Sequence, residues 1–162
     1  MNPSIIHQKD NNTKAGWLKL YVKYIKRVLD ILISLAGLPF FVVLYVVFGL
    51  LIKLEDRGPV FYKAKRIGKD GKLFEMYKFR SMKENAPNWL NADGSTYNAK
   101  DDPRVTKIGR FIRATSIDET PQIINVLKGE MSIIGPRASL SGTLGTYKDD
   151  EVDKMKVKPG IT

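Results

Sequence analysis

The chain has 162 residues, the length of one ordinary domain, and its 27 Lys and Arg against 17 Asp and Glu give a formal charge of +10. This excess predicts a polyanionic partner, which is nucleic acid, an anionic membrane surface or a phosphorylated substrate. The absence of Cys excludes disulfides, thiolate catalysis and Cys-ligated zinc, and a single His7 excludes His-based metal sites and serine-type triads within this sequence.

The N-terminal segment divides into two parts. Residues 1–15 are mostly polar and show no hydrophobic period, which predicts disorder. Residues from Trp17 to Asp30 mix apolar residues with lysines, and Trp17, Tyr21 and Tyr24 recur at helical spacing. This pattern favours an interfacial helix beside anionic lipid, with an amphipathic helix on a soluble core as the alternative.

An uncharged apolar run follows, from Ile31 to Ile52. As a helix it would be roughly 33 Å long, enough to cross a hydrocarbon core of about 30 Å. A cleaved signal peptide fits poorly, because about thirty residues precede the run and no small-residue cleavage site follows it. A core helix would be apolar on every side in a small domain, so a spanning or a membrane-dipping helix remains.

Two observations favour a re-entrant helix over a simple span. Pro39 lies near the middle of the run, where it removes a backbone hydrogen bond and predicts a sharp kink. Cations flank both ends of the run, which places both ends on the cytoplasmic side by the positive-inside tendency. We therefore expect residues 16–57 to form an interfacial and re-entrant membrane unit, with a simple span as the alternative.

Residues 58–162 read as a small cytosolic domain that begins after the break at Gly58-Pro59. Two β-rich runs, 60–67 and 73–80, enclose a turn at 69–72 that contains Gly71, which predicts a β-hairpin. A short helix is expected to begin at 81–84, and the Asn-, Gly- and Ser-rich segment 85–100 is expected to be a mobile loop.

An acidic pair, Asp118 and Glu119, precedes a run with helical apolar spacing that ends at Gly129, so the pair is expected at or near a helix N-terminus. Two interpretations stay open. Ser116-x-x-Glu119 is a capping box, and acids in a first turn complement the helix dipole without catalysis. Alternatively, one carboxylate holds a divalent metal on a phosphate and the other attacks phosphorus.

The surrounding arginines favour chemistry, because they exceed what one capping acid needs and Arg suits bidentate phosphate binding. They are Arg80, Arg104, Arg110, Arg113 and Arg137. For any single one of them, a solvated surface or a contact to lipid headgroups is the alternative.

The sequence also resembles the bacterial sugar transferases, the monotopic polyprenyl-phosphate phosphoglycosyl transferases that initiate membrane-linked glycan synthesis. The motifs that carry the resemblance are Lys26-Arg27-x-x-Asp30, Pro39 in the apolar run, Gly58-Pro59-Val60-Phe61, Arg66-x-Gly68, Tyr77-Lys78-Phe79-Arg80-Ser81-Met82, Asp102-Pro103-Arg104, Gly109-Arg110-Phe111, Ser116-x-Asp118-Glu119-x-Pro121-Gln122, Asn125-Val126-Leu127-Lys128-Gly129, Met131-Ser132 and Gly135-Pro136-Arg137. They extend over about residues 24–162.

The resemblance implies an α/β (α+β) fold in which a re-entrant membrane helix-hairpin joins a small cytosolic domain with a β-hairpin and amphipathic interfacial helices. It implies the cytoplasmic face of the bacterial inner membrane. Two departures are visible: Leu38 stands where relatives often have Ser before the Pro, and relatives usually continue past Thr162, which predicts a truncated C-terminus.

The implied reaction transfers sugar 1-phosphate from a UDP-sugar to undecaprenyl phosphate, which releases UMP and yields undecaprenyl-diphosphate-sugar for exopolysaccharide, capsule or lipopolysaccharide synthesis. Asp118 would be the nucleophile that forms a covalent phosphosugar, and Glu119 would hold Mg²⁺. Arg113 would pin the acidic pair against the membrane kink. The residues expected to bind substrate phosphate are Lys78, Arg80, Arg104, Arg113 and Arg137.

Two other function classes are weighed against the transferase. A basic membrane-surface adaptor shares the apolar run and the cations but has no use for an acid pair inside an arginine cluster. A nucleic-acid binder fits the charge but lacks a reading motif and leaves the apolar run unexplained, so no nucleic-acid partner is expected.

Overall fold

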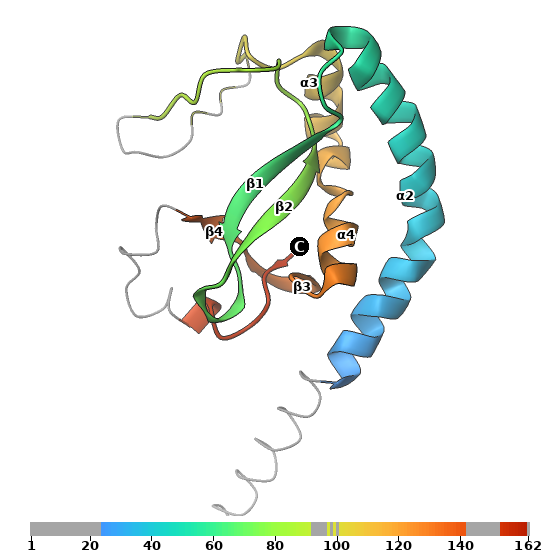
Figure 1. The fold of residues 1–162 in the computed structure, drawn as a ribbon, viewed down its shortest axis with the longest axis vertical. Coiled ribbons are helices and arrows are strands. Elements are labelled where there is room, and N and C mark those ends of the chain that lie inside the picture. Colours follow the sequence, from blue (N-terminus) through green and yellow to red (C-terminus); the bar gives the residue numbers. More distant parts are fainter. Residues whose placement is uncertain (1–23, 92–96, 98, 100, 142–152, 162) are drawn as a thin grey trace, which may run out of the picture.

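The computed structural model describes residues 24–91, 97, 99, 101–141 and 153–161. It is a mixed helix-and-sheet fold: one long helix, α2, lies along one side, α3 and α4 run along the inner side of α2, and a β-hairpin packs beside them (Figure 1). The expected α+β class is therefore confirmed. The segment 1–15, which the sequence predicts to be disordered, and the aromatic residues Trp17 and Tyr21 lie outside the described residues.

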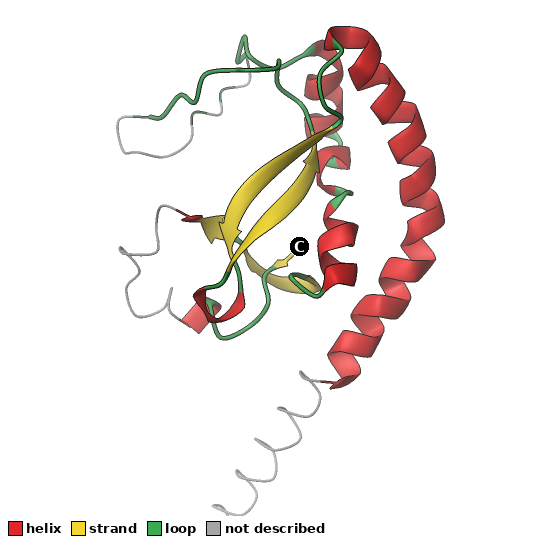
Figure 2. Cartoon of the chain, in the orientation of Figure 1, coloured by secondary structure: helices red, strands yellow, loops and turns green. Residues whose placement is uncertain are grey.

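Helix α2, Lys26–Asp56, is continuous through Pro39. The expected hairpin is not confirmed, because the described chain does not turn back at Pro39 but bows gently around the rest of the molecule (Figures 1 and 2). Proline removes one N–H donor and costs about 3 kcal/mol inside a helix. The long uncharged run on both sides offers enough helical hydrogen bonds to carry the helix past this residue.

Most large apolar side chains of α2 face outward, among them Leu32, Phe40, Val46 and Leu54, each more than half exposed. By length and composition, α2 is the one helix among the described residues that could cross a membrane, and only 17% of its most apolar stretch is buried. A core helix of a soluble domain would be mostly covered, so the core-helix alternative does not fit this exposure.

The predicted hairpin is confirmed. Strand β1, Phe61–Ile67, pairs antiparallel with β2, Leu73–Phe79, and η2, Lys69–Gly71, makes the turn. Positive φ angles at Asp70 and Gly71 (56° and 72°) explain the turn composition, since Asp and Gly adopt this conformation most readily. The short strand β4, Ser139–Leu140, joins β1 and gives the sheet order β2-β1-β4.

The segment after β2 differs from expectation. No helix forms at 81–84, where Met82 instead bridges Val105. Helix α3, Lys107–Ala114, was not predicted, and it packs so tightly on this segment that a Cβ at Gly109 would lie 1.9 Å from the Ser81 carbonyl oxygen. This close approach requires glycine at position 109.

Helix α4, Gln122–Lys128, ends at Gly129 in the left-handed conformation, as the sequence predicts. Its Asn125 side chain accepts from the Tyr77 N–H (3.0 Å) and donates to the Glu75 carbonyl (2.7 Å), so it covers the open edge of β2. Strand β3, Ser132–Arg137, follows and carries the chain back toward the hairpin.

Two apolar clusters hold these elements together. The first joins α2 to the hairpin and α3 through Phe41, Phe48, Ile52, Phe79 and Ile112. The second lies under the other face of the hairpin and consists of Ala64, Phe74, Met76, Val126 and Met131. The acidic pair lies in the short segment that connects α3 to α4, between these two clusters.

Candidate active site

Asp118 and Glu119 lie in the single turn η3, Ile117–Glu119, and α4 begins only at Gln122. The Ser116 side chain makes no capping bond at η3, and Ser116 itself is in the left-handed conformation. The capping-box interpretation is therefore wrong for this pair. The pair is nevertheless near the start of α4, as the sequence predicts.

Three elements bring charged groups to the pair. Lys78 on β2 places its Nζ 2.5 Å from Glu119 Oε1 and 3.8 Å from Asp118 Oδ2. Arg137, at the end of β3, places Nη2 3.9 Å from the same Glu119 oxygen while its side chain stays 89% exposed. An exposed guanidinium at the edge of an acid pair can receive an anion without breaking a buried contact.

The environment of Asp118 opposes its ionisation. Burial raises the pKa of the Asp118 carboxyl above its ordinary value of 3.8, and the neighbouring Glu119 raises it further, while Lys78 and Arg113 act in the opposite direction. Arg113 on α3 is held by a bond from its Nε to Ser81 Oγ, 2.8 Å. An ionised but poorly solvated carboxylate is a stronger nucleophile than one fully surrounded by water.

Two of the predicted phosphate-binding residues have structural partners instead. The buried Arg80 pairs with Asp56 at the end of α2, with Nη1 2.6 Å from Oδ2, and its Nε donates to the Pro59 carbonyl at 2.6 Å. These bonds fix the hairpin to the end of α2. Phosphate binding by Arg80 stays a prediction that these contacts do not favour.

Arg104 likewise forms a buried pair with Asp102, Nη2 to Oδ2 at 2.6 Å, and its guanidinium lies over the rings of Trp89 and Tyr97. The hydrogen bond from Arg104 lowers the pKa of Asp102 to about 2. The pair anchors the loop after β2, and phosphate binding by Arg104 stays a prediction without structural support.

Sequence reasoning gave no role to Arg66, although it lies on the same side of the hairpin as Lys78. Its Nε is buried and has no hydrogen-bond partner among the residues that the structure describes. Strand alternation could have found it, because Arg66 follows the buried Ala64 by two residues and therefore shares its face.

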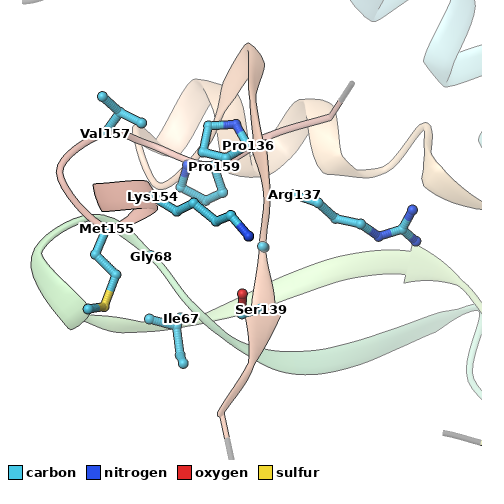
Figure 3. Close-up of a pocket in the computed structure, with 10 residues that line it drawn as sticks. Ile67, Gly68, Pro136, Arg137, Ser139, Lys154, Met155, Val157 and Pro159 are labelled. Atoms are coloured by element: carbon cyan, nitrogen blue, oxygen red, sulfur yellow. The ribbon is translucent and has the colours of Figure 1, made fainter. Parts of the chain in front are cut away.

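A tight pocket near β4 does not hold the acid pair. It closes between Gly68, Pro136, Met155 and Pro159 around about 10 Å³, roughly the space of one water molecule (Figure 3). Arg137 borders this pocket but extends away from its other labelled residues (Figure 3).

Asp118 and Glu119 alone would supply only some of the ligands that a magnesium ion needs. Within the described part of the chain, no group of three or more His, Cys, Asp or Glu side chains gathers. Magnesium in phosphoryl-transfer sites is usually held by one or two carboxylates together with substrate phosphates and water, and an adjacent carboxylate pair supplies that share. The donor chemistry therefore fits Mg²⁺ shared with a phosphorylated substrate.

The chain is similar to several bacterial proteins. The chain is 53% identical over 113 residues to a Bacillus subtilis protein with the provisional name undecaprenyl-phosphate N-acetylgalactosaminyl 1-phosphate transferase. The matched residues make up 70% of this chain and 61% of that protein. It is 40% identical over 156 residues to the undecaprenyl-phosphate galactose phosphotransferase of Salmonella typhimurium, 86% of this chain and 32% of that protein.

An Aeromonas hydrophila relative named UDP-N-acetylgalactosamine-undecaprenyl-phosphate N-acetylgalactosaminephosphotransferase is 46% identical over 143 residues, 86% of this chain and 33% of the relative. The chain thus spans between about a third and three fifths of the length of these relatives. The family model for bacterial sugar transferases matches residues 21–162, which include α2, the hairpin and the acid pair. The chain belongs to the bacterial sugar transferase family.

Proposed function

We propose that this chain transfers a sugar 1-phosphate from a UDP-sugar to undecaprenyl phosphate. The observation that carries the proposal is a half-buried carboxylate, Asp118, with a raised pKa, placed among Lys78, Arg113 and Glu119 in a chain with an exposed apolar helix. The names of the relatives support this substrate class. An ionised carboxylate needs no general base to act as a nucleophile. One that faces cations is suited to attack a phosphate whose charge those cations offset.

The proposed reaction has two displacements at one phosphorus atom. An Asp118 carboxylate oxygen attacks the phosphorus that carries the sugar, and the bond from that phosphorus to the bridging oxygen breaks, so that UMP leaves with the bridging oxygen. An oxygen of undecaprenyl phosphate then attacks the same phosphorus and releases the Asp118 carboxylate. The product is undecaprenyl-diphosphate-sugar, and the enzyme returns to its starting state.

The cations around the pair serve the first displacement. Lys78 and Arg137 lie within 4 Å of the acid pair, where they can offset the negative charge that would otherwise repel Asp118 from a diphosphate. Glu119 would help hold Mg²⁺, which when bound spreads charge on the diphosphate. In that state Lys78 would move its bond from Glu119 to a substrate oxygen.

The membrane assignment rests on α2. Its first turn is tied to α4 by Arg27, which donates to the Val126 and Leu127 carbonyls at 2.5 and 2.9 Å, and its last turn is tied to the hairpin by Asp56. A span perpendicular to the bilayer would pull parts of α3 and α4 into hydrocarbon. We therefore propose that α2 inserts its exposed face into the cytoplasmic leaflet of the inner membrane, with anionic lipid around its flanking cations.

The test is turnover by the chain in detergent or nanodiscs with undecaprenyl phosphate, Mg²⁺ and a panel of UDP-sugars. UMP release with at least one sugar supports the transferase, whereas membrane binding without UMP release would leave the adaptor alternative.

Activity should vanish with EDTA and return with Mg²⁺. Glu119→Gln should weaken the apparent metal affinity more than it weakens lipid binding, and unchanged turnover in chelator would remove the metal from the mechanism.

A further inference from the structure

The site-facing side of the β-hairpin carries a second cation besides Lys78. In the β1–β2 register Tyr62 is paired with Lys78 and Arg66 with Phe74. Because alternate residues of a strand share a face, Tyr62, Arg66 and Lys78 lie on the same side of the hairpin. The neighbouring Lys65 lies on the opposite face and is exposed.

Arg66 has no counter-ion in the part of the chain that the structure describes. Its side chain is half-buried, and its Nε is buried without a hydrogen-bond partner. Burial lowers the pKa of Arg66, the Tyr62 hydroxyl on the same face raises it, and the cation Arg137 lowers it. Burying an unpaired guanidinium is costly, so a folded chain is expected to keep one where an anion arrives.

Arg137 connects this unpaired group to the acid pair. It is exposed, it lies three residues before Leu140, the strand partner of Arg66, and it reaches to 3.9 Å from Glu119. At this separation the two like charges repel. A phosphate between the two guanidiniums would remove their repulsion and satisfy the buried Nε. We infer that Arg66 and Arg137 form a two-guanidinium site beside the acid pair that holds the nucleotide phosphate of the sugar donor.

This inference rests on the proposed function, which supplies the donor, and it commits to the nucleotide as the source of the phosphate. The start of β1 packs against α2, where the rings of Phe61 and Tyr45 stack at 5.3 Å. Arg66 lies five residues further along the strand, roughly 16 Å away along an extended strand. Figure 1 shows β1 running away from α2, so a lipid phosphate that enters beside α2 would meet Lys78 before it meets Arg66.

The experiment measures UDP binding by calorimetry with the full chain in nanodiscs, without any acceptor lipid. Arg66→Gln is compared with Lys65→Gln, which removes the same charge from the opposite face of the same strand. We expect Arg66→Gln to weaken UDP binding about tenfold or more and Lys65→Gln to change it by less than about twofold. Arg66→Lys should recover part of the loss, since Lys keeps the charge but not the bidentate geometry.

Stability provides the control for folding. Arg66 is half-buried, and its Nε has no hydrogen-bond partner among the described residues. Arg66→Gln should therefore leave the unfolding midpoint of the ligand-free chain unchanged or higher. Added UDP should raise the midpoint of the wild type and of Lys65→Gln but not that of Arg66→Gln.

The outcomes separate this inference from the proposed function. In one outcome the wild type binds UDP but transfers no sugar phosphate, and Arg66→Gln loses UDP binding. This result would support the site and refute the transferase. Normal UDP binding by a folded Arg66→Gln overturns the site even if transfer occurs. Intact UDP binding with a raised KM for undecaprenyl phosphate would also overturn it, and would assign Arg66 to the lipid. A wild type that binds no UDP overturns both.

Discussion

At the scale of single residues, Asp118 shows how a site can be built against the preference of its own side chain. Burial and Glu119 favour the protonated form of Asp118, whereas Lys78, Arg113 and a backbone hydrogen bond favour the ionised form. A purely structural acid would gain from full pairing, as Asp102 does with Arg104. The weak pairing of Asp118, 3.8 Å from Lys78, leaves an oxygen available for attack.

Asp118→Asn tests the nucleophile directly. Asn cannot form an acyl phosphate, so this variant should remain folded and bind Mg²⁺ and UDP-sugar, yet lose UMP release by orders of magnitude. In the wild type, incubation with UDP-sugar alone should leave a phosphosugar on Asp118, detectable by mass spectrometry. Near-normal turnover in a folded Asp118→Asn protein would defeat the assignment.

The same substitution makes a separate prediction about stability. The folded state keeps the Asp118 proton to a higher pH than the unfolded chain, whose value is near 3.8. The stabilising contribution of this group is therefore present below that pH and is lost as the pH rises through the raised folded-state pKa. The free energy of unfolding of Asp118→Asn should be higher than that of the wild type at about pH 7, and the difference should disappear near about pH 3.

Chemical denaturation of both proteins at the two pH values measures this effect. Asp118→Glu keeps the charge and serves as the control, which should show no gain at neutral pH. A variant that is less stable than the wild type at neutral pH would show that the Lys78 contact outweighs the cost of burial.

At the scale of elements, the positions that the sequence predicts well are those with local causes. The hairpin follows from alternation and from the Asp70-Gly71 turn, and the end of α4 follows from Gly129. The start of α3, which was not predicted, has a local and a distant cause. Thr106 Oγ1 caps it locally by accepting from the Gly109 N–H. The first N–H groups of α3 bond to the Glu55 carboxylate at the end of α2, more than fifty residues earlier in the chain.

The structural partners of Arg80 and Arg104 differ in how far the sequence reveals them. The partner of Arg80 is Asp56, on another element, so no local pattern could reveal that this guanidinium is occupied. The partner of Arg104 is different, because Asp102 stands only two residues before it and such a pair is readable from sequence. The acid pair itself was located correctly because its segment adjoins a recognisable helix.

Asn125 gives a prediction for how α4 joins the sheet. Replacing it with Leu leaves the Tyr77 N–H and the Glu75 carbonyl without their partner in a buried place, at a cost of about 1–3 kcal/mol for each unsatisfied group. Asn125→Leu should lower the free energy of unfolding by about 3 kcal/mol in urea denaturation. Asn125→Asp keeps the acceptor for Tyr77 but sets a carboxylate oxygen against the Glu75 carbonyl and the Glu130 carboxylate, so it should lose at least as much at neutral pH. A loss below about 1 kcal/mol in Asn125→Leu would show that these hydrogen bonds contribute little.

At the scale of the whole molecule, both ends of α2 belong to the same compact unit as the acid pair. Arg27 binds the last carbonyls of α4 at one end, and Asp56 binds Arg80 at the other. The flanking cations predict that both ends lie on one side of the membrane, and this arrangement of contacts supports that expectation without the sharp hairpin that Pro39 predicts. The curvature of a long helix was beyond what a single proline can specify in a sequence.

The topology can be measured with thiol labelling, which is clean because the chain has no native Cys. Single cysteines at Asn11 and Lys72 should both react with a membrane-impermeant reagent from the cytoplasmic side of inverted vesicles. Labelling of Asn11 only from the periplasmic side would establish a span, and would require the bond between Arg27 and α4 to break in the membrane.

The hydrogen bonds between Arg27 and the end of α4 fix the distance between α2 and the acid pair. Since α2 is held at both ends, the acid pair cannot rise or sink relative to the lipid surface unless these ties open. If α2 inserts as proposed, the phosphate of the lipid substrate must reach a set height to react. We therefore expect turnover to depend on the acyl-chain length, and hence the thickness, of the surrounding bilayer.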